Sequence, residues 1–352
     1  MNHPTTIAVD LAKSVFEIAV SRHPGRVCQR RRLSRSQMMP FFSQHSPATV
    51  LLEACGSSHH WARQLESLGH RVLLLPAQHV RRYVLRDKTD RADATALLEA
   101  HRNEQIVPVP VKTLHHHTIA ALHRLRSGWL STRTARINTI RGLLRELGIL
   151  IPQGPRHVLP RLAEALSDPS GPVPEPLHEV LLSAAGEIRE LESRIADVER
   201  QLKTFADRLP TAALLMTIPG IGLLTSTALI GFVGDPSRFR SGRRFASYLG
   251  LVPREHSSGL QRRLGAITKR GDAYLRTLLI HGARSTLYAA TRSRRPDRLR
   301  RWATAVRQRR GNNRAAVALA NKLARIAWAV WTRNTSFTSA AEPMNEDSPP
   351  NA

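Results

Sequence analysis

Residues 5–20 read TTIAVDLAKSVFEIAV, and this stretch decides the fold of the first third of the chain. The run 5–9 is largely apolar and ends at Asp10, and apolar residues at Phe16, Ile18 and Val20 then alternate with their neighbours. Alternation with a period of two is typical of a half-buried strand. The stretch therefore predicts adjacent strands at 5–10 and 15–20, with a carboxylate at the end of the first.

The rest of the first 112 residues continues with segments of both kinds. Apolar runs predict further strands at 49–54 and 71–75, and helical patterns fall at 37–44, at 58–68 and from 90 to 100. Strands that alternate with helices indicate an α/β domain. We therefore predict an α/β domain over residues 1–112.

The remaining sequence predicts helices. Long helices are expected at 118–149 and 177–207 within a helical region 113–208, and a Pro-, Gly- and Ser-rich stretch at 152–176 predicts a linker between them. Near-heptad spacing leaves two alternatives open, a coiled coil that dimerises the protein or a hairpin within one chain. Residues 209–334 predict a mostly helical C-terminal domain, and 335–352 a disordered tail.

The charge of the chain indicates a nucleic-acid partner. Its 352 residues include 53 Lys+Arg against 27 Asp+Glu, a formal net charge of +26, and only six of the basic residues are lysine. Arginine forks match phosphate oxygens bidentately, so nucleic acid is the expected partner. A GC-rich coding sequence would also enrich arginine, but it would not explain the shortage of acids.

The uncharged stretch 209–234 is long enough to span a membrane. It is interrupted by Pro219 and Gly220 and contains several Thr and Ser residues, so we interpret it as two short buried helices. The N-terminus shows no signal-peptide pattern. We therefore expect no membrane association and a cytoplasmic protein.

Four carboxylates stand out against this basic background. Asp10 and Glu53 end predicted strands, and Asp90 and Asp93 lie three residues apart, on one face of a helix. A buried carboxylate is costly unless it is paired or binds a metal, and clustered carboxylates suit Mg²⁺. From the residues alone, a metal site and ordinary turn or cap residues both remain open. Lys88 precedes the pair as a phosphate contact or a solvated surface lysine.

Two glycine-containing segments of the C-terminal half are candidates for phosphate binding. Gly220 and Gly222, in the run IPGIG at 218–222, indicate a helix-hairpin-helix whose backbone N–H groups approach DNA phosphates. The alternative is an ordinary turn between core helices. The second segment, LGLVPREHSSG at 249–259, predicts a phosphate-binding turn, and a serine nucleophile assisted by arginines is the less favoured alternative. The basic residues of this second segment and its surroundings are Arg254, Arg262, Arg263, Lys269, Arg270 and Arg276.

These motifs occur together in one known family. The runs IAVDLAK (7–13), EACG (53–56), KTDRADA (88–94), PGIG (219–222), GLVPR (250–254), SSG (257–259) and TKRGD (268–272) closely resemble the DEDD transposases of the insertion sequence one-ten family, particularly its eleven-eleven subgroup. Ala8 stands where that family more often has glycine. The resemblance implies an N-terminal RuvC-like, or ribonuclease H-like, domain whose acidic tetrad corresponds to Asp10, Glu53, Asp90 and Asp93. It also implies a C-terminal transposase domain whose serine corresponds to Ser258, with Ser257 adjoining it.

The resemblance further implies a mechanism. Ser258 would attack a DNA phosphodiester and form a covalent phosphoserine, while the tetrad holds Mg²⁺. An element-encoded guide RNA would select the DNA, and a homodimer or homotetramer would combine serine and tetrad from different protomers. Two other functions compete with this one: a RuvC-like junction nuclease that hydrolyses with metal-activated water, and an inactive nucleic-acid-binding descendant.

Overall fold

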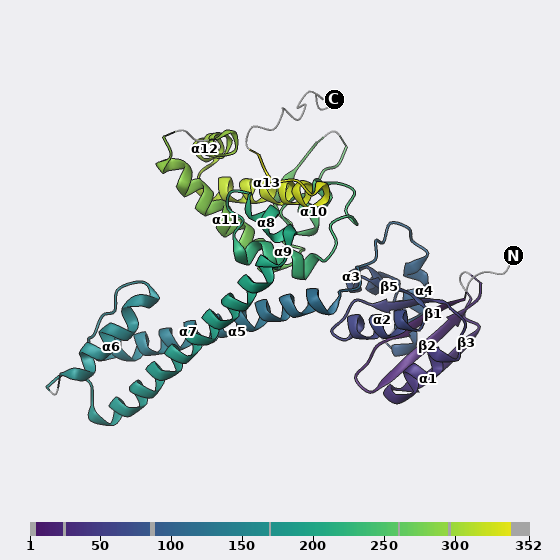
Figure 1. The fold of residues 1–352 in the computed structure, drawn as a ribbon, viewed down its shortest axis with the longest axis horizontal. Coiled ribbons are helices and arrows are strands. Elements are labelled where there is room, and N and C mark those ends of the chain that lie inside the picture. The colour runs from purple at the N-terminus through teal and green to yellow at the C-terminus, as the bar shows by residue number, and fades with distance from the viewer. Residues whose placement is uncertain are drawn as a thin grey trace. The chain divides into compact units, whose positions relative to one another are not determined.

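The computed structural model describes residues 5–23, 26–84, 89–168, 170–259, 261–294 and 297–338. The chain divides after His115 into two compact units, described separately below (Figure 1). This division falls within three residues of the predicted boundary at 112.

Unit 1 is built around one mixed sheet. Its elements are β1 (Thr6–Asp10), β2 (Val15–Ser21), β3 (Gln29–Ser34), α1 (Met38–Ser43), β4 (Thr49–Glu53), α2 (Ser58–Ser67), β5 (Arg71–Leu75), α3 (Ala77–Val80) and α4 (Asp90–His101), with 3₁₀ turns at Arg35–Gln37 and Arg81–Tyr83. The strand order is β3-β2-β1-β4-β5. β1–β2 and β2–β3 are antiparallel, whereas β1–β4 and β4–β5 are parallel. The predicted α/β character and its four strands are confirmed.

The two faces of the sheet have separate cores because successive side chains of a strand point to opposite sides. Ile7, Val9 and Phe16 lie on the face covered by α1 and α2. Ala8 and Leu51 lie on the other face, in the core that α4 completes. The small side chain at Ala8 therefore packs under α4. This alternation also determines the face on which each strand-end acid lies.

β3 is the strand that the sequence did not predict. It reads QRRRLS, and of its six residues only Leu33 is buried. An edge strand pairs on one side only, so it can carry a row of charged side chains without an apolar alternation. β3 pairs with β2, with Arg32 opposite Glu17.

Unit 2 is mostly helical. Its elements are α5 (Leu114–Glu146), α6 (Val158–Ser167), α7 (His178–Asp207), α8 (Pro210–Met216), α9 (Leu223–Val233), α10 (Gly242–Tyr248), β6 (Pro253–Glu255), β7 (Leu264–Ile267), α11 (Ala273–Arg292), α12 (Arg298–Arg310) and α13 (Asn312–Arg333), with 3₁₀ turns at Pro155–His157 and Glu175–Leu177. Its main core joins α8 to α13 with one end of α5 and α7. No helix among the described residues is long and apolar enough to cross a membrane.

α5 and α7 form a hairpin within the chain, one of the two predicted alternatives. Three arginines of α5 reach glutamates of α7, and the partners run in opposite directions along the sequence: Arg126–Glu199, Arg133–Glu192 and Arg136–Glu187. The helices are therefore antiparallel. Leu122 of α5 and Leu202 of α7 lie in the main core of unit 2, so this core extends across the predicted boundary at 208, although α7 itself ends at Asp207.

The stretch 152–176, predicted as a linker, contains α6 and two 3₁₀ turns. Val158 and Leu162, one helical turn apart, are buried against Leu144 of α5 and Leu181 of α7. The prolines suggested an irregular connection, but Pro155 begins a 3₁₀ turn, where a missing N–H costs little. This stretch closes the end of the hairpin with a core of its own.

The beginning of the predicted disordered tail is ordered. Phe337 packs against the main core of unit 2, and its backbone N–H donates to Thr217 Oγ1 at 2.9 Å. Residues 339–352 lie outside the described part of the chain.

Candidate catalytic and nucleic-acid-binding sites

The sheet brings Asp10 and Glu53 to one edge and one face. β1 and β4 are parallel neighbours in register from Thr6–Thr49 to Val9–Leu52, and Asp10 and Glu53 are the next residues of the two strands. Each follows a residue of the α4-side core by two positions, so both carboxylates are on the α4 face. Both residues are half-buried. Two members of the predicted tetrad thus lie side by side.

Asp90 and Asp93 lie in the first turn of α4, which packs on β1 and β2. The preceding Thr89 caps this helix, because its hydroxyl accepts the Ala92 N–H at 3.2 Å. Acids in a first helical turn are favoured by the helix dipole. The Asp90 side chain is 59% exposed, whereas Asp93 is half-buried. All four acids therefore occur on the α4 side of the sheet.

The structure adds Glu17 and Arg32, which the sequence analysis did not single out. Glu17 lies opposite Asp10 in the β1–β2 pair, and its side chain is only 12% exposed. Arg32 Nε is 3.6 Å from Glu17, and Arg32 Nη2 is 3.8 Å from Asp90. The period-two alternation of residues 15–20 could have indicated Glu17, because it puts Glu17 on the same face of the strand as Ala19. Arg32 thus supplies positive charge beside two carboxylates of this cluster.

The donors fit Mg²⁺ in kind, because carboxylate oxygens are its preferred protein ligands. Within the described ranges, no three His, Cys, Asp or Glu side chains are placed so that they could share one metal ion. In this arrangement, Arg32 is paired with Glu17 and Asp90. The assignment of Asp10, Glu53, Asp90 and Asp93 as metal ligands stays a prediction, and Lys88 lies outside the described residues.

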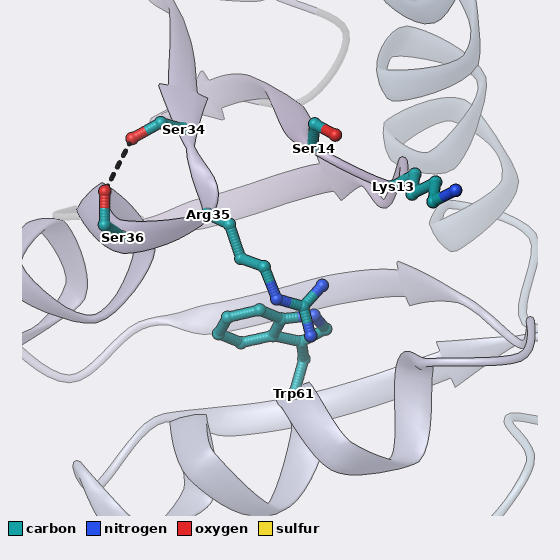
Figure 2. A pocket seen from close by; sticks show the side chains of 6 residues that line it. All are labelled: Lys13, Ser14, Ser34, Arg35, Ser36 and Trp61. Atoms are coloured by element: carbon teal, nitrogen blue, oxygen red, sulfur yellow. Dashed lines mark hydrogen bonds between the residues drawn. The ribbon is translucent and has the colours of Figure 1, made fainter.

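An open hollow of about 650 Å³ lies in unit 1, and it contains basic and hydroxyl groups (Figure 2). Its lining residues are Lys13, Ser14, Ser34, Arg35, Ser36 and Trp61. Trp61 is only 4% exposed and packs edge-on against Phe16. The Arg35 guanidinium lies 5.1 Å from the centroid of the Trp61 ring. The sequence signal for this hollow is the SRS run at 34–36, where β3 ends.

The candidate serine lies in the hairpin formed by β6 and β7. Ser258 and Gln261 pair through both backbone N–H groups at 3.2 and 3.1 Å, and Gly259 takes a φ of +55°, which favours glycine. Ser257 and Ser258 are both exposed. The chain therefore presents two adjacent hydroxyls at an exposed turn.

The two hydroxyls have different surroundings. Ser257 Oγ donates to Glu255 Oε1 at 2.8 Å and accepts the Arg263 N–H at 3.2 Å. The hydroxyl of Ser258 makes no hydrogen bond to any described residue. Ser257 is thus part of the hairpin's own bonding, and the Ser258 hydroxyl is available to another molecule.

The predicted basic residues near this hairpin fall into two groups. Arg254, Arg262, Arg263, Lys269 and Arg270 are exposed, and Arg262 Nε lies 3.4 Å from Glu255. Arg276 is half-buried, and its Nη1 donates to the carbonyl oxygens of Leu249 and Gly271 at 3.3 and 3.2 Å. Arg276 thus joins the end of α10 to the loop before α11. The other five are exposed, and their binding to nucleic acid stays a prediction.

Gly220 and Gly222, both predicted to approach phosphate, have different environments. A Cβ on Gly220 would lie 2.5 Å from the carbonyl oxygen of Gly282, so the α8–α9 turn contacts α11 backbone to backbone. Gly222 is the exposed N-cap of α9, and a Cβ there would meet nothing within 4 Å. Packing against α11 accounts for the glycine at 220. At Gly222 the N-terminus of α9 is exposed, with open space beside the N-cap residue.

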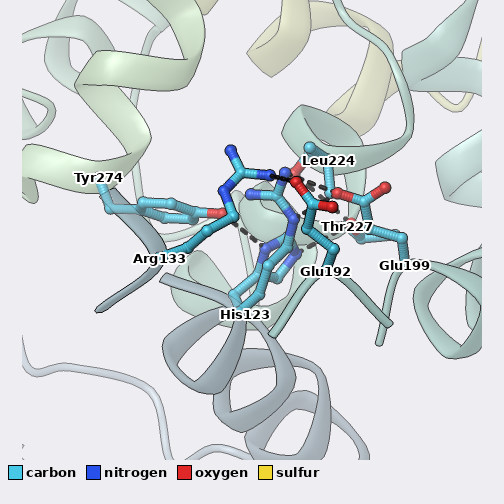
Figure 3. Close-up of polar contacts among 8 residues, drawn as sticks. His123, Arg133, Glu192, Glu199, Leu224, Thr227 and Tyr274 are labelled. Atoms are coloured by element: carbon cyan, nitrogen blue, oxygen red, sulfur yellow. Dashed lines mark hydrogen bonds and ion pairs between the residues drawn. The ribbon is translucent and has the colours of Figure 1, made fainter. Parts of the chain in front are cut away.

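A buried polar network lies at the junction of α5, α7, α9 and α11 (Figure 3). Thr227 Oγ1 donates to the Leu223 carbonyl at 2.6 Å, so it accepts from His123 Nε2 at 3.0 Å. His123 Nδ1 then accepts the Tyr274 hydroxyl proton, also at 3.0 Å. These bonds assign the neutral Nε2–H tautomer. Arg126 contacts the same region and donates to Glu199 at 2.7 Å.

Burial sets the ionisation of this network. It lowers the pKa of His123 to about 4, and the nearby Arg126 lowers it further in the same direction. Burial also raises the pKa of Tyr274, with Arg126 acting against the rise. His123 is therefore neutral at neutral pH and holds the first turn of α11, next to the loop that carries Lys269 and Arg270.

Comparisons with known proteins match both the N-terminal and the C-terminal part of the chain to transposases. Residues 7–149 match a family described as transposase, of the DEDD type of IS110, and residues 212–299 match the transposase IS116/IS110/IS902 family. A probable family 20 transposase of Pseudomonas aeruginosa is 44% identical over 94% of this chain and 98% of its own length. The transposase for insertion sequence element IS1111A of Coxiella burnetii is 37% identical over 95% of this chain and 92% of its own. That for IS1328 of Yersinia enterocolitica is 36% identical over 96% of this chain and all of its own.

A mixed sheet with strand-end acids, a basic helical unit and these matches define the class of the protein, a transposase, which is an enzyme that processes DNA. The chain belongs to the IS110 family of transposases, as its sequence motifs indicated.

Proposed function

We propose that this transposase cuts and rejoins DNA with Ser258 as its nucleophile, assisted by Mg²⁺ held by Asp10, Glu53, Asp90 and Asp93. The observation that carries the proposal is the difference between the two hairpin hydroxyls. Ser258 is exposed and makes no hydrogen bond to a described residue, whereas Ser257 is bonded to Glu255. A nucleophile has to be free to approach phosphorus.

The reaction balances as a transesterification. Ser258 Oγ bonds to the phosphorus while the bond from phosphorus to a sugar oxygen breaks. That oxygen leaves with the bonding electrons and takes up a proton, and the serine proton passes to solvent. Attack of a DNA hydroxyl on the phosphoserine reverses these changes and rejoins a strand. One phosphodiester is exchanged for another, so the reaction needs no external energy source.

The exposed basic residues around the hairpin stabilise the phosphate during this exchange. Arg254, Arg262 and Arg263 lie on or beside its strands, and Lys269 and Arg270 follow β7. Guanidinium groups aimed at phosphate oxygens stabilise the charge that develops there. When bound, Mg²⁺ polarises the same phosphate.

We further propose that unit 1 is a ribonuclease H-like, RuvC-type domain. The strand order β3-β2-β1-β4-β5, with antiparallel pairs on one side and parallel pairs on the other, supports this assignment. The resemblance also supports an element-encoded guide RNA and a homodimeric or homotetrameric active form.

The test compares two neighbouring serines. Ser258→Ala should abolish both recombination of an element-bearing plasmid and the SDS-resistant protein–DNA adduct. Ser257→Ala, the matched control, should retain the adduct. Asp10→Asn should abolish Mg²⁺-dependent activity without changing the unfolding temperature.

Two outcomes contradict the proposal. Cleavage that persists in Ser258→Ala and requires metal indicates a nuclease that hydrolyses with water. Loss of the adduct only in Ser257→Ala assigns the nucleophile to the other hydroxyl.

A further inference from the structure

One side of α11 forms an exposed stripe that the proposed chemistry does not use. The α11 stripe comprises Thr277, His281, Arg284, Tyr288 and Arg292, all of them exposed. Successive members are three or four residues apart, so they lie on the same side of the helix. The opposite side of α11 is in the main core of unit 2. The stripe is therefore a continuous surface feature.

Tyr288 is the unusual member of this stripe. It is 64% exposed, although a tyrosine usually buries most of its ring. Arg292 Nη1 donates to the Tyr288 hydroxyl at 3.1 Å, and the Arg292 guanidinium lies 5.7 Å from the ring centroid. Arg284 is one helical turn before Tyr288. An aromatic face is thus presented to solvent between two cations.

The segment from α11 to the end of the described chain carries almost no negative charge. Residues 273–338 contain fifteen basic residues and one acidic residue, Asp297. Asp297 caps α12, and its other oxygen pairs with Arg300 at 3.0 Å. α12 packs on α11 and exposes Arg298 and Arg301. On the α5–α7 hairpin, by contrast, arginines face glutamates. The charge of this surface matches a polyanion.

We propose that the α11 stripe binds unpaired DNA, with one base stacked on Tyr288 and neighbouring phosphates on Arg284 and Arg292. An exposed aromatic ring selects single strands because the faces of paired bases are already stacked within the duplex. Flanking arginines supply the backbone contacts that accompany such stacking. DNA is the strand expected here because the family acts on DNA.

This binding site goes beyond the proposed function, since the stripe takes no part in breaking or making a phosphodiester. Its test uses full-length protein carrying Ser258→Ala, in which the proposed nucleophile is absent. A failure of the serine mechanism therefore leaves this test unaffected, and a failure of this test leaves the serine mechanism standing.

The experiment measures fluorescence anisotropy with a labelled oligothymidylate of about 20 nucleotides, a duplex of equal length and an oligouridylate. Tyr288→Leu keeps apolar bulk and helix propensity but removes the flat ring, and Tyr288→Phe keeps the ring. We expect Tyr288→Leu to weaken single-stranded DNA binding about tenfold and Tyr288→Phe less than about twofold. Duplex affinity should be unchanged in both variants.

Arg284→Ala tests the phosphate contact. It should reduce the slope of log affinity against log salt by about 0.7 for the single strand. Arg194→Ala removes the same charge from an exposed position on α7, where Arg194 pairs with Glu190, and should leave the slope unchanged.

Three results would overturn the proposal. The first is equal affinity of Tyr288→Leu and Tyr288→Phe for the oligothymidylate. The second is an equal loss of duplex binding in Tyr288→Leu. The third is a loss confined to the oligouridylate, which would assign the stripe to RNA.

Discussion

Gly282→Ala tests the contact that holds the α8–α9 turn against α11. A Cβ at position 282 would lie 1.9 Å from the carbonyl oxygen of Gly220, where about 3 Å is the closest ordinary approach. The neighbour is backbone, so no side-chain rotation can make room. The turn and the helix would have to separate by about 1 Å.

The expected effect has the opposite sign from the usual one. Replacing glycine by alanine inside a helix normally stabilises a protein by about 0.5–1 kcal/mol. Overpacking costs about 1–3 kcal/mol, and more where backbone has to move. We expect Gly282→Ala to lower the free energy of unfolding by about 2–3 kcal/mol. Gly186→Ala is the matched control, because Gly186 is exposed in α7 and a Cβ there would meet nothing within 4 Å.

Thermal unfolding followed by circular dichroism at the helical band measures both variants. At about 2–4 °C per kcal/mol for a unit of this size, Gly282→Ala should lower the transition by about 4–12 °C, and Gly186→Ala should raise it slightly. A Gly282→Ala protein that melts as high as Gly186→Ala would refute the close contact between the turn and α11.

Two further predictions concern the α5 side of unit 2. The folded pKa of His123 is about 4 and its ordinary value is 6.5, so between these values the unfolded chain binds a proton that the folded chain does not. The free energy of unfolding should therefore fall by about 3 kcal/mol as the pH falls from about 6.5 to 4. Urea unfolding at several pH values measures this pH dependence, and His123→Gln should remove it. Arg126→Ala should cost about 1–2 kcal/mol, because Arg126 is 13% exposed and Glu199 would lose its partner. Arg136→Ala should cost less than about 0.5 kcal/mol, since both partners are half-exposed; equal melting temperatures of these two variants would contradict this difference.

Much of unit 1 could be predicted because its strands have alternating or continuous apolar runs. The strand 71–75 was predicted at its observed bounds, whereas β3 was not predicted, because an edge strand with three arginines has no apolar pattern. α6 was obscured by prolines that begin turns here instead of ending helices. Local patterns thus identified the strands with apolar runs, and they missed an edge strand without one and a helix that follows prolines.

The candidate sites show the same limit. Asp10 and Glu53 could be found because a strand end is visible in sequence, and their shared face follows from the pairing of β1 with β4. Arg32 could not be found from the sequence, because it lies beside these acids only through the pairing of β3 with β2. His123 is more than a hundred residues from both Thr227 and Tyr274 in the sequence, so no local pattern indicates that they are hydrogen-bonded. Long-range contacts decide such networks.

The α5–α7 hairpin makes the lengths of its two helices interdependent. Each ion pair fixes a residue of α5 opposite a residue of α7, and the stretch containing α6 closes the far end. One residue inserted into α5 alone would turn everything beyond it by about 100° and advance it by about 1.5 Å, which takes the later arginines away from their glutamates. About seven residues added to each helix, two turns on either side, would restore the facing positions. We therefore expect relatives with longer or shorter hairpins to differ by matched insertions or deletions in both helices. The stretch that contains α6 should keep its length in such relatives.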